Sequence, residues 1–187
     1  MTLRESAMKW NPHTFAALAA RHGGELLEHD APLRSAREGA AHFGIAMAQT
    51  APTLIVEADG DIFACILSSK RDGVDWDRLA RLLGRGHARL ADRRRVRDIT
   101  GCDAGAVPLL GLDLPCVMDR LLLAHDFVYG GAGDPLRTLK IAPRVLAELN
   151  QVSIWYRIAP AVYNCSRKKG TSFANASATG SGRSYRS

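Results

Sequence analysis

The sequence predicts a mixed α/β domain in which a curled mixed β-sheet is surrounded by helices. Short apolar runs rich in β-branched residues outnumber what a plain strand–helix alternation would produce, and helical segments interrupt them irregularly. Two of these runs are separated by Asp59-Gly60, a strong hairpin signal because glycine accepts the positive φ that such turns need. These observations favour a sheet of mixed strand direction over repeated βαβ units.

Five helices are expected from capping residues followed by apolar positions at helical spacing. The residues expected to begin them are Asn11 with Pro12, Ser35, Asp75, Asp92 and Pro143. Asparagine, serine and aspartate side chains accept hydrogen bonds from the first free N–H groups of a helix, and proline suits the first turn. Glycines are expected to close the first four helices, namely Gly23, Gly44, Gly84 and Gly101.

Strands are expected where apolar runs are short and bounded by turn residues. The predicted strands cover residues 25–29, 53–58, 62–68, 88–91, 106–110, 116–119, 127–129 and 137–141. Between the last two, Gly130 through Pro135 form a tight glycine-rich loop. This loop lacks the spacing of the common phosphate-binding motifs, so its glycines predict a turn or the wall of a pocket.

The charge distribution divides the chain at Asn150. The net charge is +6, and residues 151–187 carry six Lys and Arg but no Asp or Glu, which leaves residues 1–150 without net charge. Electrostatics of the whole body therefore give no argument for nucleic-acid binding. Residues 1–150 are predicted to form one domain. Residues 151–187 are predicted to be a basic, disordered tail rich in Ser, Gly and Ala, or an end foreign to the natural protein.

Several protein classes are disfavoured by the remaining composition. The cysteines Cys65, Cys102, Cys116 and Cys165 form no CxxC pair, and no histidines stand at zinc spacing. We therefore expect no bound metal and a reducing, cytoplasmic setting. The first residues contain no apolar core of a secretory signal, and the longest uncharged run, residues 39–56, is too interrupted for a membrane span.

An ordered set of short motifs resembles the YbaK/prolyl-tRNA-synthetase-associated editing domain. The motifs are Pro52-Thr53-Leu54-Ile55-Val56, Val74-Asp75, Leu90-Ala91-Asp92, Val96-Arg97-Asp98-Ile99-Thr100-Gly101, Gly105-Ala106-Val107-Pro108-Leu109-Leu110-Gly111, Pro115-Cys116-Val117-Met118-Asp119, and Tyr129 through Pro135 followed by Thr138-Leu139-Lys140-Ile141. Each motif alone is weak, but their order and spacing match the family over roughly residues 16–150.

The resemblance implies a trans-acting deacylase that hydrolyses the ester joining a wrong amino acid to the 3′ end of a tRNA. Because an aminoacyl ester is already activated, such an enzyme mainly orients the ester, stabilises the oxyanion and admits a water. In this family a ribose hydroxyl of the substrate is thought to help activate that water. The resemblance implies no cofactor, and no GxSxG elbow of a serine hydrolase is recognisable.

The resemblance also implies a set of site residues. Gly105, Ala106, Val107 and Pro108 would form a catalytic backbone loop that presents N–H groups to the ester. On this interpretation Gly105→Val removes activity without unfolding the protein. The substrate-binding residues would be His29, Asp30, Thr53, Lys70, Gly130, Gly131 and Asp134.

The chain departs from the family pattern at Pro52, where many members carry a lysine that contacts the end of the tRNA. Lys70, Arg71 or Lys140 are the candidates for supplying a charge from elsewhere. An alternative is a binding module of the same fold that has lost hydrolysis. A third is a nucleic-acid-binding protein whose affinity lies in the tail. The arginines of residues 93–97 are interpreted as a solvated helix face, with tRNA phosphate contact as the other possibility.

Overall fold

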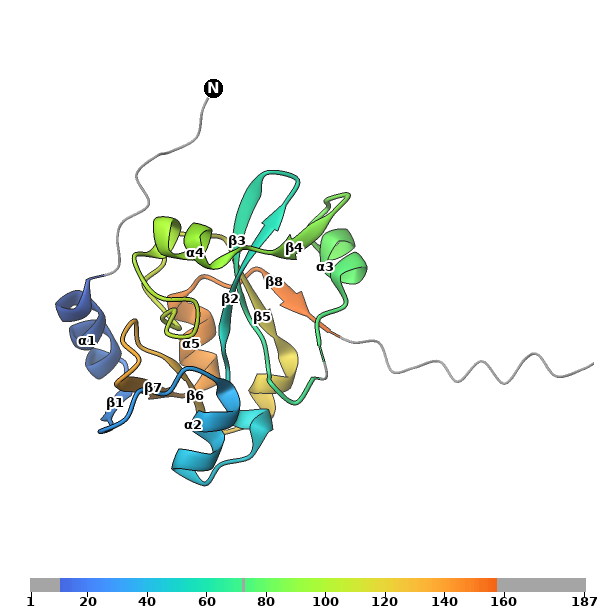
Figure 1. Ribbon diagram of the computed structural model, residues 1–187. Helices are drawn as coiled ribbons and strands as arrows, with labels where there is room; N and C mark the ends of the chain where they lie inside the picture. The colour runs from blue at the N-terminus through green and yellow to red at the C-terminus, as the bar shows by residue number, and fades with distance from the viewer. Residues whose placement is uncertain (1–10, 72, 158–187) are drawn as a thin grey trace, which may run out of the picture. The chain divides into compact units, whose positions relative to one another are not determined.

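The computed structural model describes residues 11–71 and 73–157, which form a mixed α+β fold (Figure 1). The helices in these residues are α1 (Pro12–Arg21), α2 (Ala36–Phe43), α3 (Trp76–Leu82), α4 (Arg93–Thr100) and α5 (Pro143–Leu149), with 3₁₀ turns η1 (Met47–Gln49) and η2 (Arg120–Ala124). The strands are β1 (Glu25–Glu28), β2 (Thr53–Ala58), β3 (Asp61–Ile66), β4 (Ala88–Leu90), β5 (Cys116–Asp119), β6 (Val128–Gly131), β7 (Arg137–Ile141) and β8 (Ile154–Tyr156).

The strands form two sheets. The larger has the order β4-β2-β3-β5-β8, in which β4, β2 and β3 pair antiparallel and β3, β5 and β8 pair parallel. The smaller is antiparallel, with the order β1-β7-β6. The Ala51 N–H donates to the Tyr129 carbonyl over 2.7 Å and links the entry of β2 to β6. The predicted fold class is confirmed, with two linked sheets in place of one curled sheet.

Local sequence signals explain most element boundaries. Side chains of Ser35, Asp75 and Asp92 accept hydrogen bonds from backbone N–H groups at the starts of α2, α3 and α4. At the β2–β3 turn, Asp59 and Gly60 both have positive φ, of 49° and 92°, as a tight hairpin requires. The hairpin and all five predicted helices are therefore confirmed.

The strand predicted at residues 106–110 is wrong. This segment is an irregular loop held by isolated backbone bonds, from the Leu109 N–H to the Gly131 carbonyl and from the Gly133 N–H to the Ala106 carbonyl. Pro108 has no N–H for a strand ladder. The apolar character of residues 106–110 reflects burial instead of strand pairing, because Leu109 and Leu110 are each 1% exposed.

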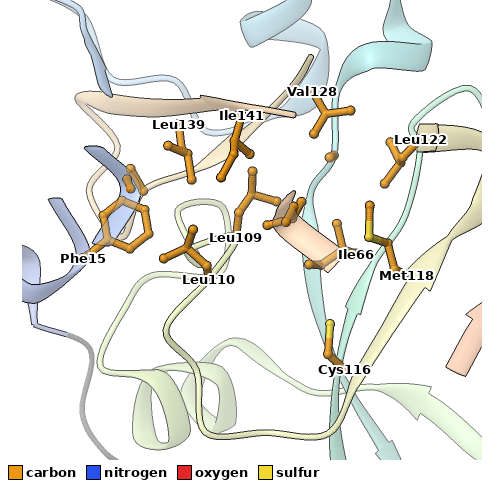
Figure 2. Close-up of a cluster of buried hydrophobic side chains, with 14 residues drawn as sticks. Phe15, Ile66, Leu109, Leu110, Cys116, Met118, Leu122, Val128, Leu139 and Ile141 are labelled. Carbon is orange, nitrogen blue, oxygen red and sulfur yellow. The ribbon is translucent and has the colours of Figure 1, made fainter. Parts of the chain in front are cut away.

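The main core lies where the two sheets and the loop at residues 106–110 meet. Figure 2 shows Leu139 and Ile141 of β7 pointing toward Leu109, with Ile66 of β3 and Met118 of β5 on the other side. All five of these side chains are buried. The irregular loop is thus packed between the sheets, which places the backbone of its other residues firmly beside β6.

The folded unit continues past the predicted boundary at Asn150. Strand β8 pairs parallel with β5, and the Tyr156 side chain is fully buried, with its hydroxyl accepting the Asp75 N–H over 3.2 Å. The compact unit ends at Arg157, so the boundary predicted from composition comes too early. Residues 158–187, and with them most of the predicted tail, lie outside the described residues. No helix in the described part of the chain is both long and apolar enough to cross a bilayer.

A buried ion pair braces this end of the large sheet. Arg71 Nη2 donates to Asp119 Oδ1 over 2.7 Å, and the guanidinium lies 4.9 Å from the centre of the Tyr156 ring. The two side chains are 6% and 0% exposed. The hydrogen bonds that Arg71 donates to Asp119 raise the pKa of Arg71, which keeps the guanidinium charged. Arg71 therefore ties the β3–α3 loop to β5 and β8 and is not free to contact a substrate.

Candidate functional site

A cleft lies between α2, the residues before β2, the loop at residues 103–108 and the start of the small sheet. The space inside it, part of which is open solvent, is about 500 Å³. The lining residues are Leu33, Ser35, Ala36, Gly39, Phe43, Thr50, Pro52, Gly105, Ala106, Tyr129, Gly130, Gly131, Asp134, Arg137 and Thr138. These residues are far apart in the sequence and are brought together by the two sheets.

One wall of the cleft is backbone packed against backbone. A Cβ atom on Gly130 would lie 2.5 Å from the Ala51 carbonyl oxygen, and one on Gly131 would overlap the Val107 carbonyl. A Cβ on Gly105 would lie 2.6 Å from the Arg34 carbonyl oxygen. The glycines are required by their own neighbours in the protein, independently of any ligand. A valine at position 105 would have to displace the Arg34 backbone or the loop itself, so a loss of activity in Gly105→Val would not by itself assign an oxyanion role to this loop.

The loop donors predicted to meet an oxyanion are already engaged. The N–H groups of Gly105 and Ala106 both donate to the Asp103 carbonyl over 2.9 Å. The Gly105 bond spans only two residues, a geometry of the tight γ-turn type. The Val107 N–H meets no acceptor among the residues that the structure describes, but Val107 is buried behind the cleft. Pro108 has no N–H, and its carbonyl accepts the Thr53 hydroxyl over 3.1 Å.

Aromatic rings form the opposite side of the cleft. The rings of Phe43 and Tyr129 lie 5.6 Å apart with a 30° tilt, and His42 lies edge-on to Phe43 at 4.7 Å. Behind them His29 is buried, with Nδ1 2.8 Å from the Ala31 carbonyl and Nε2 3.3 Å from the Thr138 hydroxyl. Since a carbonyl only accepts, Nδ1 carries a proton, and in the neutral ring Nε2 accepts from Thr138. His29 thus orients a lining residue without lining the cleft.

Arg137 is the only Lys or Arg among the lining residues. Its Nη2 lies 3.1 Å from Glu28 Oε1, and the side chain is 41% exposed. The nearby Asp134 shapes the turn that leads to it, accepting the Leu136 N–H over 2.8 Å. Among the sequence candidates for a replacement charge, Lys70 is exposed on the β3–α3 loop and Lys140 pairs with Glu25 over 2.9 Å. Neither lines the cleft.

Cysteine and metal chemistry find no support in the described residues. Cys65, Cys102 and Cys116 are buried, and burial raises the pKa of the Cys116 thiol to about 12 and that of Cys65 further still. Such thiols are poor nucleophiles and poor metal ligands near neutral pH. In residues 11–71 and 73–157, no three His, Cys, Asp or Glu side chains gather as a set that could hold a metal ion.

Comparison with known proteins bears on this cleft directly. The family model of the aminoacyl-tRNA editing domain matches residues 30–149. The chain belongs to this editing-domain family. The match covers α2, the loop at residues 103–108 and the β6–β7 region, so it includes every element that lines the cleft.

Solved structures similar to this editing domain agree on the fold. The crystal structure of a hypothetical protein is 29% identical with a TM-score of 0.67, covering 75% of this chain and 95% of that one. A protein proposed as a trans-editing enzyme for prolyl-tRNA synthetase is 25% identical with a TM-score of 0.65, covering 77% and 94%. A structure from work on epitope grafting onto scaffold proteins is 25% identical with a TM-score of 0.67, covering 76% and 93%.

The site residues expected from the sequence separate into two groups in this editing domain. Those that line the cleft are Gly105, Ala106, Gly130, Gly131 and Asp134. Those that do not are His29, Asp30, Thr53, Lys70, Val107 and Pro108. Val107 and Pro108 belong to the loop but do not line the cleft, Thr53 donates its hydroxyl to the Pro108 carbonyl, and Asp30 is exposed. The sequence interpretation missed Phe43 and Arg137. The sequence held one indication for Arg137: it begins a predicted strand only three residues after the site candidate Asp134.

Proposed function

We propose that this editing domain hydrolyses the ester of mischarged tRNA in trans, with the terminal adenosine and its amino acid held in the cleft. The observation that carries the proposal is the meeting of the Gly105 loop and the Gly130–Gly131 wall at one cleft within the family-matched region. The partner is then the aminoacylated 3′ end of tRNA, and the setting is the cytoplasm.

The nucleophile in this proposal is water. Three lining hydroxyls have hydrogen-bond partners within the protein: Thr50 donates to the Met47 carbonyl, Ser35 accepts the Glu38 N–H, and Thr138 is bonded to His29. Water oxygen attacks the ester carbonyl, the bond to the ribose oxygen breaks, and that oxygen takes up a proton. The products are free amino acid and uncharged tRNA. The protein contributes orientation and stabilisation of the oxyanion, which suffice for an ester that is already activated.

Arg137 supplies the positive charge that Pro52 lacks in this proposal. Both residues line the cleft, so a guanidinium on β7 reaches the space that a lysine before Thr53 would otherwise serve. Guanidinium groups bind phosphate and ribose oxygens through several N–H donors. The exposed Glu28 partner holds Arg137 only weakly, which leaves the guanidinium able to exchange to a substrate.

The test is a hydrolysis assay with a panel of mischarged tRNAs and their correctly charged counterparts. We expect release of amino acid from at least one mischarged tRNA, at a rate above that of the correct pair and of tRNA without protein. Release from no member of the panel would contradict the proposal.

A second candidate function is a non-catalytic module that binds the tRNA end. It is favoured by one observation, namely that the Gly105 and Ala106 N–H groups already donate to the Asp103 carbonyl. Binding of tRNA without any deacylation would support this function and exclude the first.

A further inference from the structure

A second groove adjoins the cleft on the far side of the Gly105 loop. Its lining residues are Arg34, Arg93, Arg97, Asp103, Ala104, Gly105, Ala106 and Pro135. Gly105 and Ala106 line both the groove and the cleft, so the two spaces are separated only by this short piece of backbone. A chain that lies in the groove can therefore enter the cleft by passing over the loop.

Helix α4 divides its arginines between this groove and solvent. Arg93 and Arg97 are four residues apart, so they share one helical face, and both line the groove. Arg94 points elsewhere, since its side chain is 93% exposed and its Nε lies 4.0 Å from Asp98. Arg95 Nε lies 3.6 Å from Glu57 of β2. The arginine run is thus only partly the solvated face expected from the sequence.

The charge of the groove is positive. Three arginines line it, against the single acidic residue Asp103, which pairs with Arg97. Arg93 makes no ion pair with any residue that the structure describes. The guanidinium of Arg34 also makes no ion pair with the described residues. Glu38 lies nearby, and its pKa is lowered first by the hydrogen bond from the Arg34 N–H, then by the Ser35 side chain, and to a smaller extent by the charge of Arg34. An excess of positive charge therefore lies beside the cleft, in a body (residues 1–150) whose charges sum to zero.

We propose that this groove binds the backbone phosphates of the single-stranded 3′ end of tRNA, immediately before the nucleotide that enters the cleft. The inference rests on the proposed function, because it takes the cleft to hold the terminal nucleoside. Proteins that hold single strands without reading their sequence use a basic groove that follows the backbone. Arg34, Arg93 and Arg97 provide such a groove at the entrance to the site, and they require no recognition of a base.

The test compares Arg93→Gln with Arg94→Gln, which removes the same charge from the same helix but outside the groove. Affinity for uncharged tRNA is measured at several salt concentrations. We expect Arg93→Gln to weaken binding several-fold and to reduce the slope of log affinity against log salt by about 0.7, the value for one phosphate contact on a single strand. Arg94→Gln is expected to retain the wild-type affinity and slope. Equal effects of the two substitutions, or no effect of Arg93→Gln, would overturn the proposal.

A kinetic arm separates this inference from the proposed function. The ratio of kcat/KM for charged tRNA to that for 3′-aminoacyl-adenosine, which has no phosphates, is measured in each variant. The ratio is expected to fall several-fold in Arg93→Gln and to match the wild type in Arg94→Gln. If it falls equally in both, the groove assignment is wrong. If the wild type hydrolyses neither substrate, the proposed deacylation fails, while the salt-dependent binding experiment still decides the groove.

Discussion

Pro52 and Arg137 lie in the same cleft although 85 residues separate them in the sequence. The proline has no charge and no N–H, whereas the arginine carries a permanent charge at the start of β7. In the proposed function, the charge absent at Pro52 is supplied from another strand of the same site. Only the fold suggests such an exchange, because the two residues share no local motif.

Replacing Arg137 tests this exchange. We expect Arg137→Gln to lower kcat/KM for mischarged tRNA by about 10- to 100-fold, since a hydrogen bond to a charged group contributes about 1.5–3 kcal/mol. The stability of the fold should change by less than about 1 kcal/mol, because the Arg137–Glu28 pair is largely exposed. Hydrolysis assays and urea unfolding measure the two effects.

Lys140→Gln is the matched control for this substitution. Lys140 lies on the same strand and also pairs with a glutamate of β1, but it does not line the cleft. Its activity should equal that of the wild type. An equal loss of activity in Arg137→Gln and Lys140→Gln would show that the loss comes from disturbing β7 and not from removing a charge in the cleft.

At the scale of single elements, the β2–β3 hairpin is tied to the chain before β4 through one carboxylate. Asp59 accepts the Gly86 N–H over 2.6 Å and the His87 N–H over 3.1 Å. The hydrogen bond from Gly86 is the main cause that lowers the pKa of Asp59 below its ordinary value of 3.8. The ionised carboxylate therefore favours the folded state above that value, and its contribution is lost as the pH falls through the lowered pKa.

Acid unfolding tests the role of this turn. Between about pH 5 and pH 2.5, the wild type is expected to lose more stability than Asp59→Asn, which keeps a side-chain acceptor but does not titrate. Asparagine also tolerates the positive φ at this position. Asp113→Asn serves as control, because Asp113 is exposed and makes no hydrogen bond with the described residues. Identical acid sensitivity of the wild type and Asp59→Asn would show that the Asp59 carboxylate does not contribute to the loss of stability in acid.

Elements defined by local chemistry were predictable from the sequence, and those defined by tertiary contacts were not. Capping by Ser35, Asp75 and Asp92 depends on residues within one helical turn, so these helices were placed correctly. The apolar run at residues 106–110 was misassigned because burial between two sheets produces the same pattern as a strand. Strand β8 was missed because it has only three residues and exists through pairing with β5.

The candidate site divides in the same way. Gly105, Gly130 and Gly131 were predictable because the family motifs contain them, although the structure explains them by contacts with Arg34, Ala51 and Val107. Thr53 and His29 were misplaced because a motif position does not disclose whether a side chain faces the cleft or supports it from behind. The direction in which a side chain points depends on the packing of segments that are distant in sequence.

At the scale of the whole molecule, the end of the folded unit depends on β8. Tyr156 is fully buried, and its ring contacts the guanidinium of the Arg71–Asp119 pair. We expect a chain ending at Arg157 to unfold at the same temperature as the full-length protein. A chain ending at Asn150 should be less stable by about 3–5 kcal/mol or more, the usual cost of removing a large buried aromatic residue.

Thermal and urea unfolding of the three lengths measure this difference. Equal stability of the two truncated chains would show that β8 is dispensable. The same chain ending at Arg157 also tests the tail as a source of RNA affinity, because it lacks five of the six basic residues that follow Asn150. Unchanged affinity for tRNA would exclude the tail and leave the body of the protein as the binding surface.

The backbone wall of the cleft limits how this editing-domain family can diversify. At Gly105, Gly130 and Gly131 any side chain would collide with main-chain atoms, so mutation has almost no freedom there. The opposite wall is different, because Ala36, Gly39 and Phe43 lie on one face of α2, and a Cβ on Gly39 would meet nothing within 4 Å. If the cleft holds the amino acid as proposed, selection for a new amino acid can act on α2 while the glycine wall is inherited unchanged.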